Sequence, residues 1–172
     1  MSALPHQLHR IQSAAGPDAT AVSVRMARSE DYEPILRVLE FANFHRIPCA
    51  EMPGFDISRC FVAEVGSLVV GAAGYTILPN GRGKTTLMAV DPEFRRYGIG
   101  RLLQELRMRE LSRLGCSQVI TNADLPDTIA WYKKHFGYRE IGTLRKMHEF
   151  GDPTILEWTT LEADLDSWAP PA

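Results

Sequence analysis

Two arginines and two glycines, spaced to bind phosphate, are the clearest chemical signal in the sequence. Arg95 and Arg96 precede Gly98 and Gly100, and a helix is expected to begin directly after them. Glycine lets the backbone turn sharply and leaves room for a ligand, while the free N–H groups of a helix N-terminus attract anions. The two guanidinium groups add charge-assisted donors for phosphate oxygens. The segment predicts an anion-binding turn; a lone Gly-x-Gly used only for packing is the alternative.

The elements on either side set the position of this turn. Thr85 to Val90 is β-branched and apolar, which predicts a buried strand. Asp91-Pro92 ends the strand, because proline lacks the N–H that a sheet requires and restricts the residue before it. A helix follows, with one apolar face made by Ile99, Leu102, Leu103, Leu106, Leu111 and Leu114.

This order of strand, turn and amphipathic helix resembles the acetyl-CoA-binding motif of the GCN5-related N-acetyltransferase (GNAT) superfamily, Arg/Gln-x-x-Gly-x-Gly/Ala. Arg95, Gly98 and Gly100 stand at the motif positions. The resemblance covers roughly residues 22–162 and implies acetyl-CoA as the co-substrate, without a metal. The residues that it implies for cofactor binding are Met88, Ala89, Val90, Arg95, Arg96, Gly98, Ile99, Gly100, Arg101 and Asn122.

A second segment resembles the closing motif of the same superfamily, in which a helix carries a tyrosine and is followed by glycine and a strand. Here the segment runs from Asp127 to Tyr138, and Tyr132 stands one residue further from Gly137 than in the usual pattern. The resemblance implies that Tyr132 protonates the leaving thiolate. A phenol with a pKa of about 10 is able to protonate a thiolate with a pKa of about 8.5. The alternative is a core aromatic beside Trp131.

The general base is the least defined part of the predicted site. Many GNAT relatives carry a glutamate on the central strand, but Thr85 to Val90 contains no acid. The candidates elsewhere are Glu51, His148, Glu64 and His45. Each also fits a structural or solvated role, and deprotonation through ordered water is an equal alternative. The base matters because an alkylamine with a pKa of about 10.4 must lose its proton before attack, at a cost of roughly 4–5 kcal/mol at pH 7.

The acceptor is expected to enter opposite the pyrophosphate, between the 45–55 segment and the last two strands. The polar groups there are His45, Arg46, Glu51, His148, Glu149 and Glu157, and the apolar ones are Met52, Phe55 and Trp158. Two prolines stiffen the segment, so we expect a small, preformed pocket for a small-molecule amine or an amino acid. The alternatives are a protein N-terminus or lysine as acceptor, and a non-catalytic acyl-CoA-binding module.

Composition argues against several other classes of protein. The chain of 172 residues is 45% hydrophobic and 23% charged, which fits one soluble domain. Its net charge of −2 gives no basic field for nucleic acid, and no apolar run reaches the roughly 20 residues of a membrane helix. The N-terminus lacks a signal-peptide pattern. Three cysteines at unrelated spacing suit a reducing compartment and no zinc site. We expect a cytoplasmic monomer or homodimer.

The periodicity predicts seven strands and three helices in the order β-α-β-β-β-α-β-α-β-β. The expected strands are 22–26, 60–65, 68–78, 84–90, 118–122, 139–149 and 154–161, and the expected helices are 30–43, 99–114 and 127–136. This order predicts an α/β (α+β) fold, with a mixed, mostly antiparallel twisted sheet and helices on both faces. The GNAT resemblance adds a splayed parallel strand pair. Residues 22–165 are expected to form one domain, after a mobile arm (1–21) and before a loose tail (166–172).

Overall fold

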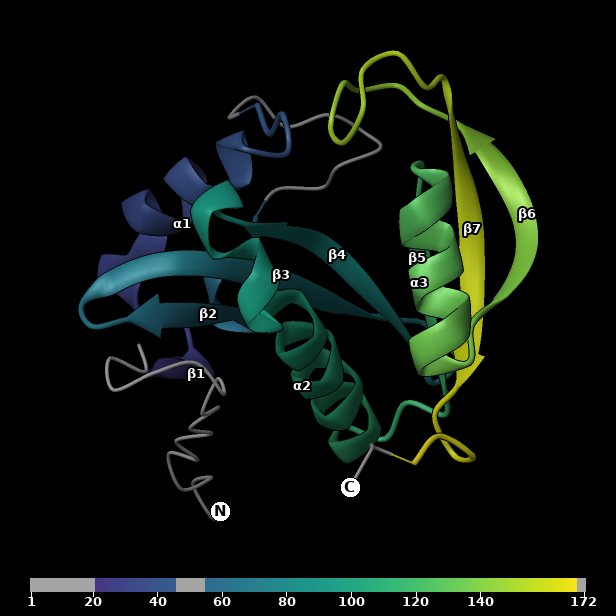
Figure 1. The fold of residues 1–172 in the computed structure, drawn as a ribbon. Coiled ribbons are helices and arrows are strands. Elements are labelled where there is room, and N and C mark those ends of the chain that lie inside the picture. Colours follow the sequence, from purple (N-terminus) through teal and green to yellow (C-terminus); the bar gives the residue numbers. More distant parts are fainter. Residues whose placement is uncertain (1–20, 46–54, 170–172) are drawn as a thin grey trace.

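The computed structural model describes residues 21–45 and 55–169, and in them a seven-stranded sheet carries helices on both faces (Figure 1). The strands are β1 (Val22–Met26), β2 (Cys60–Val65), β3 (Leu68–Leu78), β4 (Arg82–Val90), β5 (Gln118–Ala123), β6 (Arg139–Arg145) and β7 (Glu157–Asp164). The helices are α1 (Tyr32–Glu40), α2 (Ile99–Arg113) and α3 (Pro126–Phe136), with short 3₁₀ helices η1 (Ser29–Asp31), η2 (Ile57–Arg59) and η3 (Pro92–Tyr97). The predicted order of strands and helices is confirmed.

The sheet divides into two halves between β4 and β5. Its strand order is β1-β2-β3-β4-β5-β7-β6, and β4 with β5 is the parallel pair among antiparallel neighbours. These two strands pair only where Arg82–Lys84 meets Gln118–Ile120, although β4 runs on to Val90. Figure 1 shows them moving apart beyond that point. The predicted fold class, including the splayed parallel pair, is confirmed.

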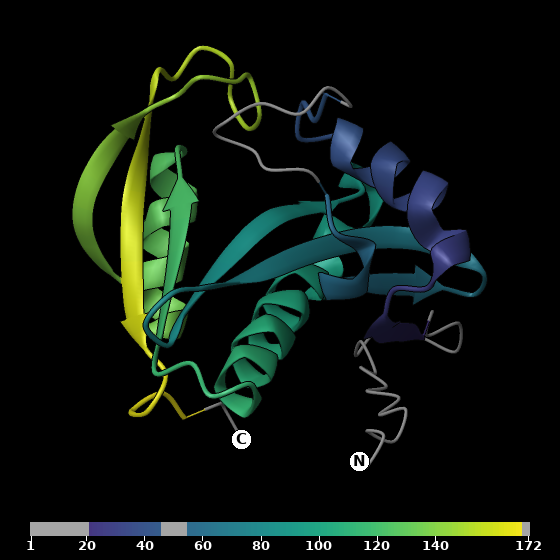
Figure 2. The same ribbon diagram turned by 180° about the vertical axis from the view of Figure 1, so that it is seen from behind.

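Two apolar clusters hold the helices against opposite faces of the sheet. Helix α1 buries Ile35, Val38 and Leu39 against one face, and α2 and α3 pack on the other, as the opposed views of Figures 1 and 2 show. Successive residues of β4 serve both clusters: Leu87 and Ala89 belong to the α1 side, whereas the side chains of Met88 and Val90 pack on the α2 side. The strand is therefore held from both faces where it leaves β5.

A β-bulge interrupts β4 just before this region. Tyr75 of β3 pairs with Thr85 and Ala73 pairs with Met88, so two residues of β4 stand opposite Gly74 alone. A Cβ atom on Gly74 would lie 2.6 Å from Thr86 Oγ1, so a side chain there would displace the Thr86 hydroxyl. A second irregularity, in the pairing of β3 with β2, falls at Val70. Bulges bend a strand and re-aim its residues.

The remaining differences from the predicted elements lie at their ends. The turn after Asp91 is the six-residue helix η3, because Pro92 opens it and the Asp91 side chain caps it by accepting from the Glu93 N–H at 3.0 Å. Strand β4 begins two residues earlier than predicted, β6 ends at Arg145, and β7 begins at Glu157. The segment between β6 and β7 is a loop rather than a tight turn.

Part of the predicted domain plan lies outside the described residues. Residues 1–20 of the expected arm and residues 170–172 of the expected tail fall there, as does the 46–54 segment with Arg46, Glu51 and Met52. No helix within the described ranges is long and apolar enough to cross a membrane.

Candidate functional site

The predicted anion-binding turn, residues 95–101, is here named the phosphate turn. It joins η3 to α2 through Gly98, a glycine in the left-handed conformation. Gly98 has a φ of 72°, a conformation that disfavours other residues. The first hydrogen bond of α2 runs from the Leu102 N–H to the Gly98 carbonyl at 3.1 Å, so the N–H groups of residues 99–101 have no partner within the helix. No atom lies within 4 Å of a Cβ placed on Gly98 or Gly100, so both backbones face open space. The turn fits an anion.

The arginines of the turn differ in their surroundings. Arg95 is exposed and lines the pocket described next, whereas Arg101 pairs with Glu105 at 3.0 Å on the surface of α2. The side chain of Arg96 lies outside the described part of the structure.

A cleft of about 360 Å³, here named the donor pocket, opens between the splayed strands. It brings together six of the residues predicted for the site: Met88, Ala89, Val90, Arg95, Asn122 and Tyr132. These residues come from β4, η3, β5 and α3. They line one cleft because β4 and β5 splay apart beyond Lys84 and Ile120. Arg95, at the start of the phosphate turn, lines one end of the donor pocket. The lining therefore fits a co-substrate with a phosphate end and an apolar arm.

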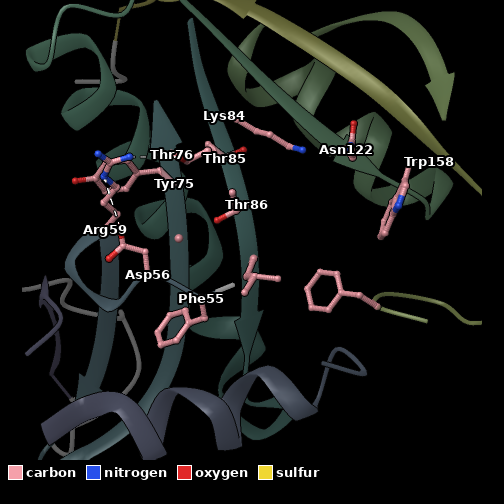
Figure 3. A pocket seen from close by; sticks show the side chains of 13 residues that line it. Phe55, Asp56, Arg59, Tyr75, Thr76, Lys84, Thr85, Thr86, Asn122 and Trp158 are labelled. Carbon is pink, nitrogen blue, oxygen red and sulfur yellow. Dashed lines mark hydrogen bonds and ion pairs between the residues drawn. The ribbon is translucent and has the colours of Figure 1, made fainter. Parts of the chain in front are cut away.

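A second cavity of about 280 Å³, the acceptor pocket, lies over β3 and β4 near η2 (Figure 3). Its lining residues are Phe55, Asp56, Arg59, Gly74, Tyr75, Thr76, Lys84, Thr85, Thr86, Leu87, Asn122, Phe150 and Trp158. Thr86, Asn122, Phe150 and Trp158 line both pockets. The two cavities therefore meet at the bulge of β4, where the strands separate.

Tyr132 is 4% exposed, lines the donor pocket and is fixed by other aromatic rings. Its ring meets Trp131 and Tyr138 edge to face, with centroids 5.0 and 5.2 Å apart. Its hydroxyl has no hydrogen-bond partner among the described residues. The side chain thus belongs to the core and also borders the cleft, which keeps both sequence interpretations open.

Asn122 stands where the two pockets join. Its Oδ1 accepts a hydrogen bond of 3.0 Å from Thr160 Oγ1 on the neighbouring strand β7. The amide nitrogen is therefore turned away from that bond and offers two donors. Figure 3 shows the Lys84 ammonium reaching toward Asn122 across the acceptor pocket.

The candidate bases predicted from sequence do not converge on either pocket. His148 accepts from the Phe150 N–H at 2.9 Å and lies beside the His45 ring, 5.2 Å away, and neither imidazole lines a pocket. His45 also pairs with Glu149 at 3.4 Å, and Glu64 pairs with Arg25 at 2.5 Å. Glu51 lies outside the described residues.

One carboxylate, Asp56, is present among the described residues that line the acceptor pocket. Its Oδ1 accepts from the N–H and the hydroxyl of Ser58, and its Oδ2 lies 3.8 Å from Arg59 Nε. Arg59 Nη1 also donates to Thr76 Oγ1 at 3.4 Å. Burial raises the pKa of Tyr75, the phenol on this wall, to about 12. Tyr75 therefore stays protonated at neutral pH and does not act as a base.

The loop between β6 and β7 closes one side of the cleft. Lys146 forms a buried ion pair of 2.8 Å with Asp124 at the end of β5, and its Nζ lies 4.2 Å from the Trp158 ring centroid. Gly151 reaches across to the turn after α1, where its N–H donates to Ala42 O at 2.8 Å. Its carbonyl accepts from Asn43 Nδ2 at 2.6 Å. These bonds join the two halves of the sheet above the splay.

Two buried polar residues of α2 were missed by the sequence interpretation. Gln104 and Arg107 are fully buried, whereas Leu114, predicted on the apolar face, is 40% exposed. The sequence contains a signal for the burial of Arg107. Ile99, Leu103 and Leu111 recur every four residues on one face of the helix, and Arg107 occupies the remaining position of that series. The apolar face of the helix is thus interrupted at its centre.

The described residues show no cluster of three or more His, Cys, Asp or Glu side chains able to hold a metal ion. Cys60 and Cys116 are buried free thiols, and burial raises the pKa of Cys60 to about 12. Neither thiol lines a pocket.

The sequence and the fold are similar to those of known acetyltransferases. Residues 56–140 match the model of the acetyltransferase (GNAT) domain family. Many solved structures share the fold, among them an N-acetyltransferase from Staphylococcus aureus Mu50 with a TM-score of 0.66 and 20% identity. That match covers 84% of this chain and 98% of the other.

Two further structures illustrate the range of proteins with this fold. The ribosomal-protein-S18-alanine N-acetyltransferase from Escherichia coli matches with a TM-score of 0.66 and 18% identity, covering 88% of this chain and 96% of its own. A putative acetyltransferase from Salmonella typhimurium, solved with its cofactor acetyl-CoA, matches with a TM-score of 0.66 and 17% identity, covering 88% and 98%. At these identities the likeness establishes the fold.

Proposed function

We propose that this chain, in which residues 56–140 match the model of the acetyltransferase (GNAT) domain family, transfers the acetyl group of acetyl-CoA to the primary amine of a small molecule or amino acid. The transfer is by direct attack, with both substrates bound at once. The observation that carries this proposal is the meeting of two pockets at the β4 bulge, where four residues line both. A thioester in one pocket and an amine in the other would meet there.

The donor pocket and the phosphate turn hold acetyl-CoA in this proposal. The N–H groups of Ile99, Gly100 and Arg101 bind the pyrophosphate, assisted by Arg95 and Arg96. The backbone of Met88–Val90 and the amide of Asn122 bind the pantetheine arm between the splayed strands. Gly98 adopts the left-handed conformation that turns the chain from η3 into α2, and so places the phosphate turn next to this arm.

Acetyl-CoA supplies an activated acyl thioester. The amine nitrogen forms a bond to the carbonyl carbon, the C–S bond breaks, the amine loses a proton and the thiolate gains one. A backbone N–H of Met88–Val90 stabilises the developing oxyanion. The Tyr132 hydroxyl, which has no other partner in the described chain, gives its proton to the thiolate.

Water removes the proton of the amine in this proposal, with Glu51 or His148 as the alternatives. Among the described residues of the acceptor pocket, Asp56 is already engaged by Ser58 and Arg59. The Tyr75 phenol stays protonated. A pocket that carries Arg59 and Lys84 also disfavours the ammonium form of a bound amine, which lowers the amine pKa.

The size of the acceptor pocket supports a small acceptor. A volume of about 280 Å³ is at the lower end of ligand sites. Aromatic walls from Phe55, Phe150 and Trp158 suit an apolar body on the amine.

We further propose that the protein works in the cytoplasm, as a monomer or homodimer, without nucleic-acid or membrane partners.

The test is a thiol-release assay with acetyl-CoA and matched acceptors. The panel pairs small primary amines and free amino acids with short peptides that carry the same groups at their N-terminus or on lysine. Release of CoA with the small amines, and a product that has gained one acetyl group by mass, is the expected result. Transfer to the peptides alone would establish a protein-modifying enzyme. CoA binding without transfer to any acceptor would establish a non-catalytic acyl-CoA-binding module.

A further inference from the structure

Arg107 is a fully buried cation at the centre of α2 with neutral partners only. Its Nη1 donates to Gly74 O at 3.1 Å and to Thr86 O at 3.4 Å. Its Nη2 contacts Met88 Sδ at 3.3 Å and donates to Gln104 Oε1. No carboxylate among the described residues pairs with it, and its Nε has no partner there.

Such a group is costly to the folded state. Moving a charge from water into the protein interior is unfavourable unless a counter-charge and a full set of hydrogen bonds compensate for it. A leucine or methionine would continue the apolar face that Ile99, Leu103 and Leu111 begin. Packing of α2 therefore does not require an arginine at this position.

The two carbonyl groups that Arg107 binds flank the bulge of β4. Thr86 is one of the two residues that stand opposite Gly74, and a bulge leaves backbone groups without ladder partners. A buried carbonyl without a donor is unfavourable. Arg107 supplies donors to both strands at once, so the bulge is held from the side opposite the acceptor pocket.

The guanidinium lies directly behind the junction of the two pockets. Thr86 lines both of them, and Met88, whose sulfur Arg107 contacts, lines the donor pocket. Gln104 extends the network by donating from Nε2 to the Tyr138 hydroxyl at 2.9 Å. Tyr138 in turn supports the Tyr132 ring edge to face. One network thus reaches both the bulge and the proposed acid.

We propose that Arg107 is a positioning residue for acyl transfer, acting through the β4 bulge. It fixes the backbone from Thr86 to Met88 in the geometry that meets the thioester. It also places an uncompensated positive charge behind the point where the carbonyl oxygen becomes negative, and such a preorganised charge in a dry site favours that oxygen in the transition state. This inference rests on the proposed acetyl transfer.

The test compares three variants of the full chain. Arg107→Met removes the charge and the donors at similar length, and Arg107→Lys keeps the charge but lacks the second amino group that contacts Met88 and Gln104. Arg109→Met is the matched control, because Arg109 lies two residues away on the same helix and is exposed. For each, kcat and KM are measured with a saturating amine, CoA affinity is measured by calorimetry, and folding by thermal unfolding.

Arg107→Met is expected to lower kcat by roughly tenfold to hundredfold, as misplacement of reacting groups does, with CoA affinity within about threefold of wild type. Its melting temperature serves as the check on folding, because the loss of the donors to Gly74 and Thr86 and the removal of a buried charge have opposite effects on stability. Arg107→Lys should lie between this variant and wild type in kcat, and Arg109→Met should match wild type.

A purely structural role gives a different pattern. In that case kcat of each folded variant stays within about threefold of wild type, or CoA affinity falls in parallel with kcat, and either result overturns the inference. If Arg107→Met does not fold, Arg107→Lys decides by the same criteria. If wild type transfers acetyl to no amine, the proposed function fails as well. If wild type is active and the Arg107 variants are as active as wild type, this inference alone fails.

Discussion

Thr160 Oγ1 donates a 3.0 Å hydrogen bond to Asn122 Oδ1, and this pairing sets which atoms of Asn122 face the two pockets. The acceptor oxygen is used on β7, so the amide N–H groups are the ones left for a substrate. Asn122→Ala is expected to raise the KM for acetyl-CoA about fivefold to tenfold, because one hydrogen bond is worth about 1 kcal/mol. Steady-state kinetics at a fixed amine concentration measure it.

Thr160→Val provides the companion experiment. It keeps the shape but removes the bond that orients Asn122, so a smaller rise in KM is expected, about twofold. Thr159→Val is the control on the same strand, because Thr159 lines neither pocket. A KM unchanged in Asn122→Ala would show that the amide does not contact the co-substrate.

Gly98→Ala tests the phosphate turn. The φ of 72° at Gly98 is strained for alanine by about 1 kcal/mol, and a Cβ there would point into open space rather than into the protein. Against a bound pyrophosphate the same Cβ would clash, so the KM for acetyl-CoA should rise at least tenfold. Calorimetric titration with CoA measures the loss directly.

Gly66→Ala is the matched control for backbone strain. Gly66 has a φ of 61° and open space around its Cβ position, but it lies in the hairpin between β2 and β3. Both variants should lose similar stability in thermal unfolding, and only Gly98→Ala should lose CoA affinity. Equal CoA affinities in the two variants would remove the phosphate site from this turn.

Tyr132→Phe separates the proposed acid from a core aromatic. Loss of a general acid typically lowers rates by about 10² to 10⁴, so kcat should fall by that factor while the KM for acetyl-CoA stays nearly constant. The ring contacts with Trp131 and Tyr138 remain, which should preserve folding. Tyr32→Phe, at an exposed tyrosine on α1, serves as control. Full activity of Tyr132→Phe would support the core role.

The ion pair of Arg25 with Asp31 predicts how stability depends on pH. Hydrogen bonds from the Arg25 guanidinium hold the pKa of the Asp31 carboxyl below its ordinary value of 3.8. A lowered folded-state pKa adds stability that is present above the unfolded pKa and is lost as pH falls through the folded one. The free energy of unfolding should therefore decline as pH drops below about 4.

Arg25→Met should lower the free energy of unfolding at pH 7 by about 2 kcal/mol and flatten this acid decline. Arg28→Met is the control: its side chain forms an exposed pair with Glu30, and its charge is the smallest of the causes that lower the pKa of Asp31, so stability should change by less than about 0.5 kcal/mol. Urea unfolding at several pH values measures both effects. An unaltered acid profile in Arg25→Met would contradict the role of this pair.

The fold was predictable because local signals agreed along the chain. Pro92 after a β-branched run, glycines at the turn and apolar periodicity in α2 and α3 all point to the same order of elements. The phosphate turn was predictable for the same reason, since its residues are neighbours in sequence. The splay of β4 from β5 came from the family resemblance, because pairing between distant strands leaves no local pattern.

The parts of the site that sequence did not reveal depend on distant contacts. The acceptor pocket joins η2 to Trp158, and the loop closure links Gly151 to Ala42, across more than a hundred residues. Arg107 was hidden for another reason: an arginine on a helix is usually solvated, and only its place in the four-residue series marks it as buried. His45 and His148 looked suited to the acceptor, but their rings pair with each other outside both pockets.

The central claim is that acetyl passes directly between two pockets that meet at the β4 bulge. Initial velocities of CoA release, measured over a matrix of acetyl-CoA and amine concentrations with the best acceptor of the panel, test it most directly. Direct attack in a ternary complex predicts double-reciprocal lines that intersect, with free CoA formed only when both substrates are present. Parallel lines, or release of CoA from acetyl-CoA before the amine is added, would show an acetylated enzyme intermediate and contradict this account.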